Sequence, residues 1–490
     1  MLAMEQRIFL LILTSLLLLS ACGPSQKTVA DLPTMQATPE AVTQTLPSPA
    51  TATPVSETPL SIEEKSTVYD FQLIFDYEQH TAQVEQSITY LNKSPFTLQK
   101  ILLVIPARAF PGAYLQQELT GPTVAEIQED GIRTTLTLTD PLLTGQNLVI
   151  NLRYDLDLPQ REGTFGYTQR QSNLSNWYPF IPPLNAEGAW ISHDPQIDLT
   201  NMLVGEYIVN EIANFNLTFV PAGSQKNIQI ATGAVPTPIE GGMQYKLEKA
   251  RALSFSISDQ YYLEEIDHNG LLIQAYVFQN QAAKASAMLS IAAQAMDLFS
   301  DLYTAYTRDR IVLVSADFLH NMEMDGMVLL SNKIIDFYDN TPLNNLTILI
   351  PHELSHQWFY SLVGNDQALE PWLDESIASY SESLFYENYY PQHLQWWWEN
   401  RVYAHEHSGY VNNSIYQAGT YENYRSSVYL NGAIFMQNLR QTVGDQVFFE
   451  GLKNYIQNYS YQIADKGLFF ESFDGFNEED FQPLLARFFR

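Results

Sequence analysis

The five residues His352-Glu353-Leu354-Ser355-His356 form an H-E-x-x-H motif. On a helix, residues four apart lie on the same face, so the two imidazoles can bind one metal ion. Glu353 lies beside them and can take a proton from water held at that metal. Nineteen residues after His356 comes Glu375. Two histidines and one glutamate leave the fourth position of zinc open, so the sequence predicts a catalytic zinc site.

The N-terminal residues have the pattern of an export signal. Arg7 precedes an apolar run over residues 8–19, which is too short to span a bilayer but suits the core of a signal peptide. The run ends in Leu19-Ser20-Ala21-Cys22, which resembles a bacterial lipobox. We therefore expect residues 1–21 to be a signal peptide and Cys22 to carry a lipid. Ordinary secretory cleavage beside an incidental cysteine is the alternative.

Residues 22–63 are rich in Pro, Thr, Ser and Ala. Such a segment cannot bury enough apolar surface to fold, so we predict a disordered tether behind the lipidated Cys22. The expected location is the extracytoplasmic side of the cell membrane, with the lipid as the only membrane contact. Cys22 is the only cysteine, which excludes an intramolecular disulfide and a thiolate metal site.

The charge balance excludes some partners. The chain has 25 basic and 55 acidic residues, a net charge of −30. This excess argues against nucleic acid or anionic lipid as a partner of the folded part. The sequence does not indicate how many subunits the protein has.

The remaining chain divides into two predicted domains, which together define a multidomain α+β fold. Residues 64–265 show the alternation of apolar and polar residues that is typical of strands, and we predict an all-β sandwich or saddle. The predicted strands include residues 71–75, 82–90, 215–219, 228–230 and 253–257.

Residues 266–490 are predicted to form a mainly helical catalytic domain. Apolar residues recur at three- and four-residue steps from Ala282 to Tyr306, which indicates a long helix. Short strands are expected at residues 311–314 and 327–330, and Pro371 is expected to open the helix that holds Glu375. Because proline lacks an N–H, we expect the motif helix to start near Pro351 or to bend there. Further helices are predicted at residues 433–439, 447–459 and 481–489.

Two segments resemble the aminopeptidase N family of zinc metallopeptidases (gluzincins), which includes leukotriene hydrolase. Residues 352–359 read H-E-L-S-H-Q-W-F and residues 372–375 read W-L-D-E, where the family has H-E-L-x-H-Q-W-F and W-L-N-E with the same spacing. The resemblance implies a thermolysin-like catalytic domain behind a β domain. It also implies that His352, His356 and Glu375 bind Zn²⁺ and that Glu353 is the general base.

Two shorter segments extend the resemblance. His320–Gly326 is similar to the family's G-x-M-E-N segment, whose glutamate binds the substrate's free amine, and this implies that role for Glu323. His320 and Met324 depart from the family's Gly and Asn. Tyr429-Leu430-Asn431-Gly432-Ala433 is similar to Y-x-K-G-A, so Tyr429 is the candidate donor to the oxyanion, with Tyr421 and Tyr424 as alternatives.

The resulting prediction is an enzyme that hydrolyses peptide bonds and releases N-terminal amino acids from peptides outside the cytoplasm. The resemblance stops at Arg490, so we expect a short form without the family's C-terminal helical domain. That expectation and the altered residues around Glu323 leave open an endopeptidase or a dipeptide-releasing peptidase. A hydrolase of non-peptide bonds and a catalytically silent surface binding protein are further alternatives. Glu353 favours catalysis, since a binding protein has no need of a base.

Overall fold

The computed structural model of the protein describes residues 66–200, 202–223 and 227–490, which belong to one compact unit, Leu60–Arg490. The predicted signal peptide, Cys22 and the tether lie outside the described residues. Within those residues, no helix combines the length and apolar character needed to cross a membrane.

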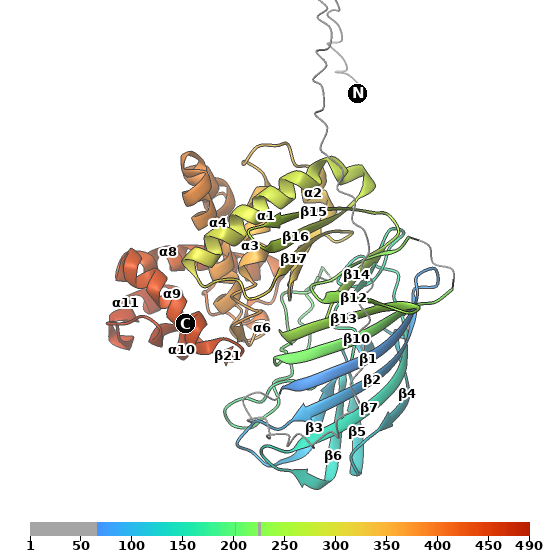
Figure 1. The fold of residues 1–490 in the computed structure, drawn as a ribbon. Coiled ribbons are helices and arrows are strands. Elements are labelled where there is room, and N and C mark those ends of the chain that lie inside the picture. Colours follow the sequence, from blue (N-terminus) through green and yellow to red (C-terminus); the bar gives the residue numbers. More distant parts are fainter. Residues whose placement is uncertain (1–65, 201, 224–226) are drawn as a thin grey trace, which may run out of the picture. The chain divides into compact units, whose positions relative to one another are not determined.

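The first part of the described chain is rich in strands (Figure 1). A seven-stranded sheet has the order β12 (Val235–Ile239), β13 (Gly242–Ala250), β10 (Ala213–Pro221), β1 (Thr67–Asp76), β2 (Thr81–Leu91), β7 (Asn147–Asp157) and β4 (Tyr114–Thr120). A three-stranded sheet has the order β3 (Leu98–Val104), β6 (Arg133–Leu142) and β5 (Val124–Asp130). A four-stranded sheet has the order β11 (Gln229–Ala231), β14 (Phe255–Ser258), β9 (Ser172–Leu174) and β8 (Phe165–Tyr167).

The alternation seen in the sequence decides which side chains of these strands are buried. In β1 the side chains of Phe71, Leu73 and Phe75 face the core, while those between them face outward. The antiparallel partner β2 buries Ala82, Val84 and further alternate residues in register with them. The predicted strands around residues 71–75, 82–90, 215–219, 228–230 and 253–257 are all present.

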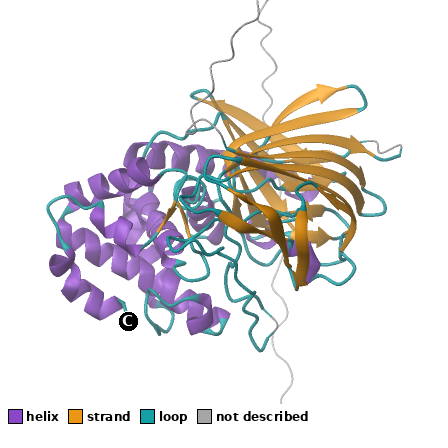
Figure 2. Cartoon of the chain, turned by 90° about the horizontal axis from the view of Figure 1, so that it is seen from below, coloured by secondary structure: helices purple, strands orange, loops and turns teal. Residues whose placement is uncertain are grey.

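The second part combines a five-stranded sheet with helices, one of which lies between two of its strands, so the predicted order of a β-rich part and a mainly helical part is confirmed (Figures 1 and 2). The sheet has the order β15 (Tyr261–His268), β16 (Leu271–Phe278), β17 (Arg310–Ala316), β19 (Met327–Ser331) and β18 (Met322–Met324). The helices are α1 (Ala282–Leu302), α2 (Asn332–Asp336), α3 (Asn345–Ser355), α4 (Trp372–Tyr389), α5 (Leu394–Trp397), α6 (Ile415–Ala418), α7 (Tyr421–Tyr424), α8 (Asn431–Val443), α9 (Asp445–Tyr459), α10 (Lys466–Glu471) and α11 (Glu478–Phe488). A short parallel pair, β20 (Gly364–Asn365) and β21 (Ile463–Ala464), lies among the helices.

Two predicted helix limits are corrected. Helix α1 ends at Leu302 rather than Tyr306, because Tyr303 leaves helical geometry and its hydroxyl pairs with Ser381 on α4 at 2.6 Å. The motif helix α3 begins at Asn345, so a start near Pro351 is wrong. The Asn344 side chain caps this helix by accepting a hydrogen bond from the Thr347 N–H at 3.1 Å. The cap fixes the start, and Pro351 lies inside the helix.

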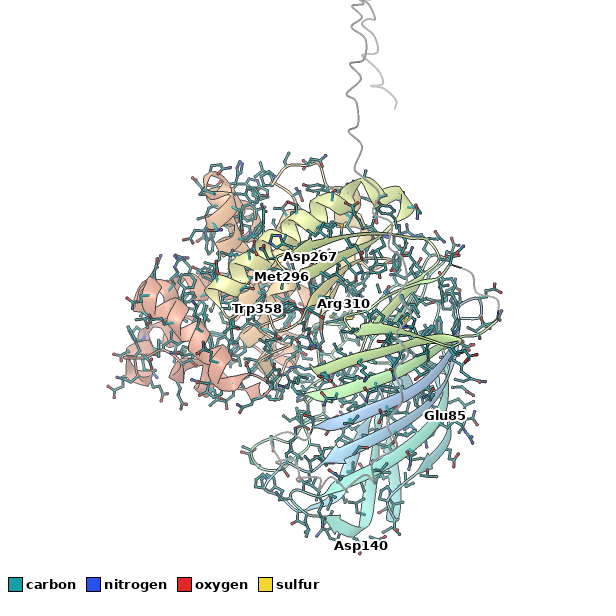
Figure 3. The ribbon with its side chains drawn as sticks, in the orientation of Figure 1. Glu85, Asp140, Asp267, Met296, Arg310 and Trp358 are labelled. Carbon is teal, nitrogen blue, oxygen red and sulfur yellow. The ribbon has the colours of Figure 1, made fainter. Side chains whose placement is uncertain are left out.

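The helical part has its own apolar core, which positions the helices that contribute the site. Its members come from α1, α3, α4, α8 and α9 and from the five-stranded sheet. Figure 3 marks two of them, Met296 on α1 and Trp358 just beyond the motif. The Trp358 ring is fully buried and its N–H donates to the Thr304 carbonyl at 2.8 Å. This packing fixes the C-terminal end of α3, where the motif lies.

Candidate active site

Two helices bring the three predicted metal ligands together. His352 and His356 lie at the C-terminal end of α3, and Glu375 lies in the first turn of α4. The Glu375 Oε2 atom is 3.2 Å from His352 Nε2 and 3.6 Å from His356 Nε2. Ligands roughly 2.0 Å from a tetrahedral zinc are roughly 3.3 Å apart, so these spacings fit zinc.

The Nδ1 atoms of the His352 and His356 rings are both held by hydrogen bonds. The two Nε2 atoms, which face Glu375, are therefore suited to bind a metal. His356 Nδ1 is 3.1 Å from the Phe359 carbonyl, which can only accept, so Nδ1 carries the proton. His356 Nε2 is buried and has no hydrogen-bond partner among the described residues. His352 Nδ1 in turn lies 2.9 Å from Glu382 Oε1. In the neutral rings, both Nε2 atoms therefore hold a lone pair directed at one point.

The charges also favour a cation at this point. Burial favours neutral Glu375, but its hydrogen bond with His352 and the nearby His356 imidazole outweigh burial and keep the pKa of the carboxyl below its ordinary range. Burial opposes protonation of both rings, yet the surrounding carboxylates raise both pKa values, that of His352 to about 9. These buried groups strongly favour an added positive charge. A divalent metal can supply that charge as well as protons can.

A second group of side chains fixes the His352 ring through its Nδ1 atom. Glu382 lies seven residues after Glu375 on α4, and its carboxylate is fully buried. It accepts hydrogen bonds from Arg401 Nε at 2.8 Å and from Arg401 Nη2 at 2.7 Å, and one from the Trp397 indole at 3.1 Å. Arg401 comes from a π-helical turn, Trp398–Tyr403. This bidentate ion pair fixes the carboxylate that orients the His352 ring.

Glu353 and Tyr429 lie beside the three ligands. Glu353 is buried on α3, and burial raises its pKa to about 7, which suits a group that takes up and releases a proton. Tyr429 comes from a second π-helical turn, Arg425–Leu430, and its hydroxyl donates to Glu375 Oε1. Its ring lies parallel to His352, with 5.8 Å between the ring centroids. The alternative, Tyr424, packs edge-on against Tyr429 at 5.6 Å.

Close contact between α4 and α8 allows Tyr429 to reach Glu375. Gly432, at the start of α8, lies against Ser376, the residue after Glu375. A Cβ atom at position 432 would lie 2.2 Å from Ser376 Oγ and 3.0 Å from Ser376 Cα. Only glycine permits this distance between the two helices.

A cluster of three acids, of which Glu323 and Asp374 are buried and Glu206 is half-buried, lies next to the metal site. Glu323 on β18, Asp374 on α4 and Glu206 from the β-rich part surround the side-chain amide of Gln367. Oxygens of Glu323 and Asp374 and a nitrogen of His356 lie within 4.8 Å of one another. Burial raises the pKa of Glu323 and of Asp374 to about 8, with a contribution from neighbouring carboxylates, and raises that of Glu206 well above its ordinary value. This cluster therefore attracts a cation.

Strand β18 is held in place by the motif helix and by the β-rich part. Gln357, the residue after the motif, donates to the Met324 carbonyl at 2.9 Å and accepts from the Gly326 N–H at 2.9 Å. Asp325 accepts from the N–H groups of Arg251 and Ala252, each at 3.0 Å. Met324 is buried in a small apolar core, so its side chain replaces the family's Asn without entering the acid cluster. These contacts fix the position of Glu323.

His320 occupies the position at which the aminopeptidase N family has glycine. Its ring packs edge-on against Tyr421, with 5.0 Å between the centroids, and against Phe318 at 5.7 Å. The added side chain thus contacts α7 rather than the acid cluster.

Five residues of the site were not found from the sequence: Glu206, Gln367, Asp374, Glu382 and Arg401. Asp374 lies in the W-L-D-E segment, but no role was predicted for it. A signal existed for Glu382, since a residue seven positions after Glu375 lies on the same face of a helix. No local pattern marks Glu206, Gln367 and Arg401, which reach the site from separate loops and turns.

Part of this chain is similar to known aminopeptidases. Residues 287–488 match the model of the Peptidase family M1 domain. Aminopeptidase M1-B of Oryza sativa subsp. japonica is 27% identical over 223 residues, which cover 41% of this chain and 25% of the relative. Aminopeptidase 2 of Candida albicans is 20% identical over 407 residues, which cover 76% of this chain and 42% of the relative.

Among solved structures, an M1 zinc metallopeptidase variant from Deinococcus radiodurans aligns with a TM-score of 0.62 and 16% identity. It covers 86% of this chain and 93% of the solved chain. At this identity the likeness establishes the fold. This chain spans only a quarter of the length of the first plant relatives. The ligand geometry and the match to the M1 domain model together identify Zn²⁺ as the metal that fits the site.

We expect Arg401→Gln to lower the affinity for zinc, because Glu382 would no longer be held against His352. The loss of such a supporting partner lowers metal affinity by roughly 10–100-fold. The zinc affinity of Arg401→Lys should lie between those of Arg401→Gln and the wild type. Lysine keeps the charge but cannot make the bidentate contact with Glu382. Affinity is measured by competition with a chelator. Arg440→Gln, which breaks an ion pair with Glu387 outside the site, is the control. Equal zinc affinities for Arg401→Gln and Arg440→Gln would contradict the prediction.

Proposed function

We propose that this protein is a zinc metallopeptidase that releases N-terminal amino acids from peptides. The observation that carries the proposal is the acid cluster of Glu206, Glu323 and Asp374 directly beside the three metal ligands. Peptide hydrolysis is supported by the M1 domain, and the names of the relatives support aminopeptidase action. The preference for free N-termini rests on the cluster.

The residues of the site divide the reaction among them. His352, His356 and Glu375 would hold the zinc, which when bound acts as a Lewis acid toward the scissile carbonyl and makes water more acidic. Glu353 takes the proton of the attacking water and then delivers it to the leaving amine. Tyr429 is placed to donate its hydroxyl proton in a hydrogen bond to the oxyanion, because this hydroxyl already lies beside Glu375.

The acid cluster fixes which peptide bond is cleaved. In a peptide with a free N-terminus, a single Cα atom separates the α-ammonium from the first carbonyl. An ammonium between Glu323 and Glu206 therefore places that first carbonyl beside the metal ligands, since a Glu323 oxygen lies within 4.8 Å of a His356 nitrogen. Because Glu323 and Asp374 are buried and Glu206 is half-buried, these carboxylates attract an ammonium more strongly than exposed ones would.

Endopeptidase or dipeptide-releasing action is the competing candidate. His320 and Tyr421 form an aromatic contact close to β18 where the family resemblance has glycine. Side chains of this size beside β18 can change how many residues of a peptide extend past the acid cluster. Comparison of free and N-acetylated peptides separates the endopeptidase from the aminopeptidase, and the length of the released fragment separates the dipeptide-releasing peptidase.

We further propose that the protein is an exported lipoprotein anchored through Cys22. The support is the sequence pattern of residues 1–22 and the tether composition that follows.

We expect Glu353→Gln to retain zinc and the native fold but to lose nearly all peptide hydrolysis, because an amide cannot accept the proton of water. The measurement is hydrolysis of an aminoacyl-arylamide panel, with zinc content and melting temperature determined on the same samples. Glu370→Gln, a carboxylate of the loop before α4, is the control. Wild-type rates in a zinc-loaded Glu353→Gln variant would disprove the mechanism, and an inactive wild type would favour a binding protein.

An N-acetylated peptide should be cleaved much more slowly than its free-amine form, because acetylation removes the charge that the acid cluster binds. We expect Glu323→Ala and Glu206→Gln to reduce this discrimination by about 10- to 100-fold each, the usual effect of losing a hydrogen bond to a charged group. Most of the loss should appear in KM, since the ammonium is bound in both the ground state and the transition state. Equal rates on blocked and free peptides would exclude the aminopeptidase and leave the endopeptidase.

Cys22→Ser should release the protein from the membrane fraction, because lipidation requires the thiol of this residue. The measurement is fractionation of cells that express each form, with mass spectrometry of the mature N-terminus. Ser20→Thr is the control. Retention of Cys22→Ser on the membrane, or a mature chain that begins elsewhere, would contradict the lipoprotein proposal.

A further inference from the structure

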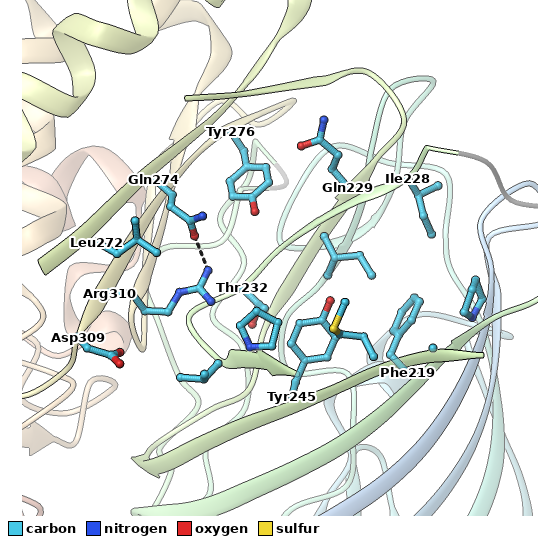
Figure 4. A pocket seen from close by; sticks show the side chains of 16 residues that line it. Phe219, Ile228, Gln229, Thr232, Tyr245, Leu272, Gln274, Tyr276, Asp309 and Arg310 are labelled. Carbon is cyan, nitrogen blue, oxygen red and sulfur yellow. Dashed lines mark hydrogen bonds between the residues drawn. The ribbon is translucent and has the colours of Figure 1, made fainter. Parts of the chain in front are cut away.

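A cavity of about 620 Å³ lies apart from the catalytic residues, between the edge of the seven-stranded sheet and the five-stranded sheet (Figure 4). Strands β10, β12 and β13 form one wall, β16 with the start of β17 forms the other, and residues of and beside β11 also line the cavity. Its lining is mostly apolar and includes Phe219, Ile230, Met243 and Leu272. A cavity of this size and character, with a few polar groups directed into it, is typical of a small-molecule site.

Arg310, the first residue of β17, supplies a buried positive charge to this cavity. Its side chain is 7% exposed. It donates to the Ala234 carbonyl at 3.0 Å and to Gln274 Oε1 at 2.5 Å. Two of its five N–H groups are thus paired, and the buried Nε atom has no partner among the described residues.

No carboxylate of the described chain forms an ion pair with Arg310. Asp309 also lines the cavity but does not lie within ion-pairing distance, and Glu265 instead accepts a hydrogen bond from Gln274 Nε2 at 2.7 Å. Burial without a partner lowers the pKa of Arg310, although Tyr276 and Asp309 partly oppose this effect. An unpaired buried guanidinium is costly, and an anion that enters the cavity would remove that cost.

Two tyrosine hydroxyls add uncharged donors. Tyr245 on β13 and Tyr276 on β16 are both largely buried, and their hydroxyls point into the space between the two sheets (Figure 4). Neither hydroxyl has a hydrogen bond among the residues that the structure describes. The cavity thus combines an unpaired cation and two free hydroxyl donors with apolar walls.

We propose that this cavity binds a small monocarboxylic acid with an apolar body, with the carboxylate at Arg310 and the hydroxyls of Tyr245 and Tyr276 and the body against Phe219, Ile230 and Met243. The nearby Asp309 and Glu265 carboxylates disfavour a second negative charge on the ligand, which selects a monoanion. The ligand chemistry differs from that of the peptide substrates, so the proposal does not depend on the catalytic one.

The test is calorimetric titration of the zinc-loaded full-length protein with 4-phenylbutyrate, compared with 4-phenylbutan-1-ol and 4-phenylbutylamine. We expect saturable binding of one carboxylate per chain. The alcohol and the amine should bind at least about tenfold more weakly, because they lose the charge-assisted hydrogen bond to Arg310. Equal affinities for the acid and the alcohol, or no saturable binding of the acid, would overturn the proposal.

Variants distinguish carboxylate binding in this cavity from carboxylate binding at the metal site. Arg310→Met should weaken 4-phenylbutyrate binding about tenfold or more without changing zinc content. Arg153→Gln, which removes an exposed arginine paired with Glu118, should bind as the wild type does. If Arg310→Met does not fold, Tyr276→Phe and the cavity-filling Ile230→Trp give the same comparison. Unchanged affinity in folded Arg310→Met, or in both of the other variants, would overturn the proposal.

Discussion

The attraction between the Glu375 carboxylate and the imidazoles of His352 and His356 is the interaction on which the site depends. All three side chains are buried, and they come from two helices that pack against each other. Burial alone would favour a neutral Glu375, so the carboxylate stays ionised only because positive charge lies beside it. Whatever cation occupies this point, a proton or a metal, therefore also stabilises the contact between α3 and α4.

The surrounding structure limits where that cation can lie. Arg401 and Glu382 hold one imidazole, and the Phe359 carbonyl holds the other. Both π-helical turns contribute a side chain to the site, Arg401 in one case and Tyr429 in the other. An added residue in a helical turn rotates the following side chains, which is one reason why such turns are frequent at functional sites.

The acid cluster gives the β-rich part a role in selecting the substrate. Glu206 comes from that part of the chain, while Glu323 and Asp374 belong to the sheet and helix that follow it. Gln367 joins the three, and Asp325 ties the strand of Glu323 to the backbone of Arg251. The two parts therefore build one binding surface, and a separated helical part would lack one of its carboxylates.

The sequence by itself determined the features that depend on local spacing: the two motif histidines on one face of α3, the alternating strands of the β-rich part, and the presence of the longer helices. Periodicity reports burial within one element, which is why these predictions were accurate. It did not determine where α3 begins, because the Asn344 cap outweighs the effect of Pro351. Glu206, Gln367 and Arg401 reach the site only through the packing of distant segments, and Arg310 faces a cavity only because two sheets meet there. Tertiary structure decided these positions, since charge complementarity across elements leaves no pattern along the chain.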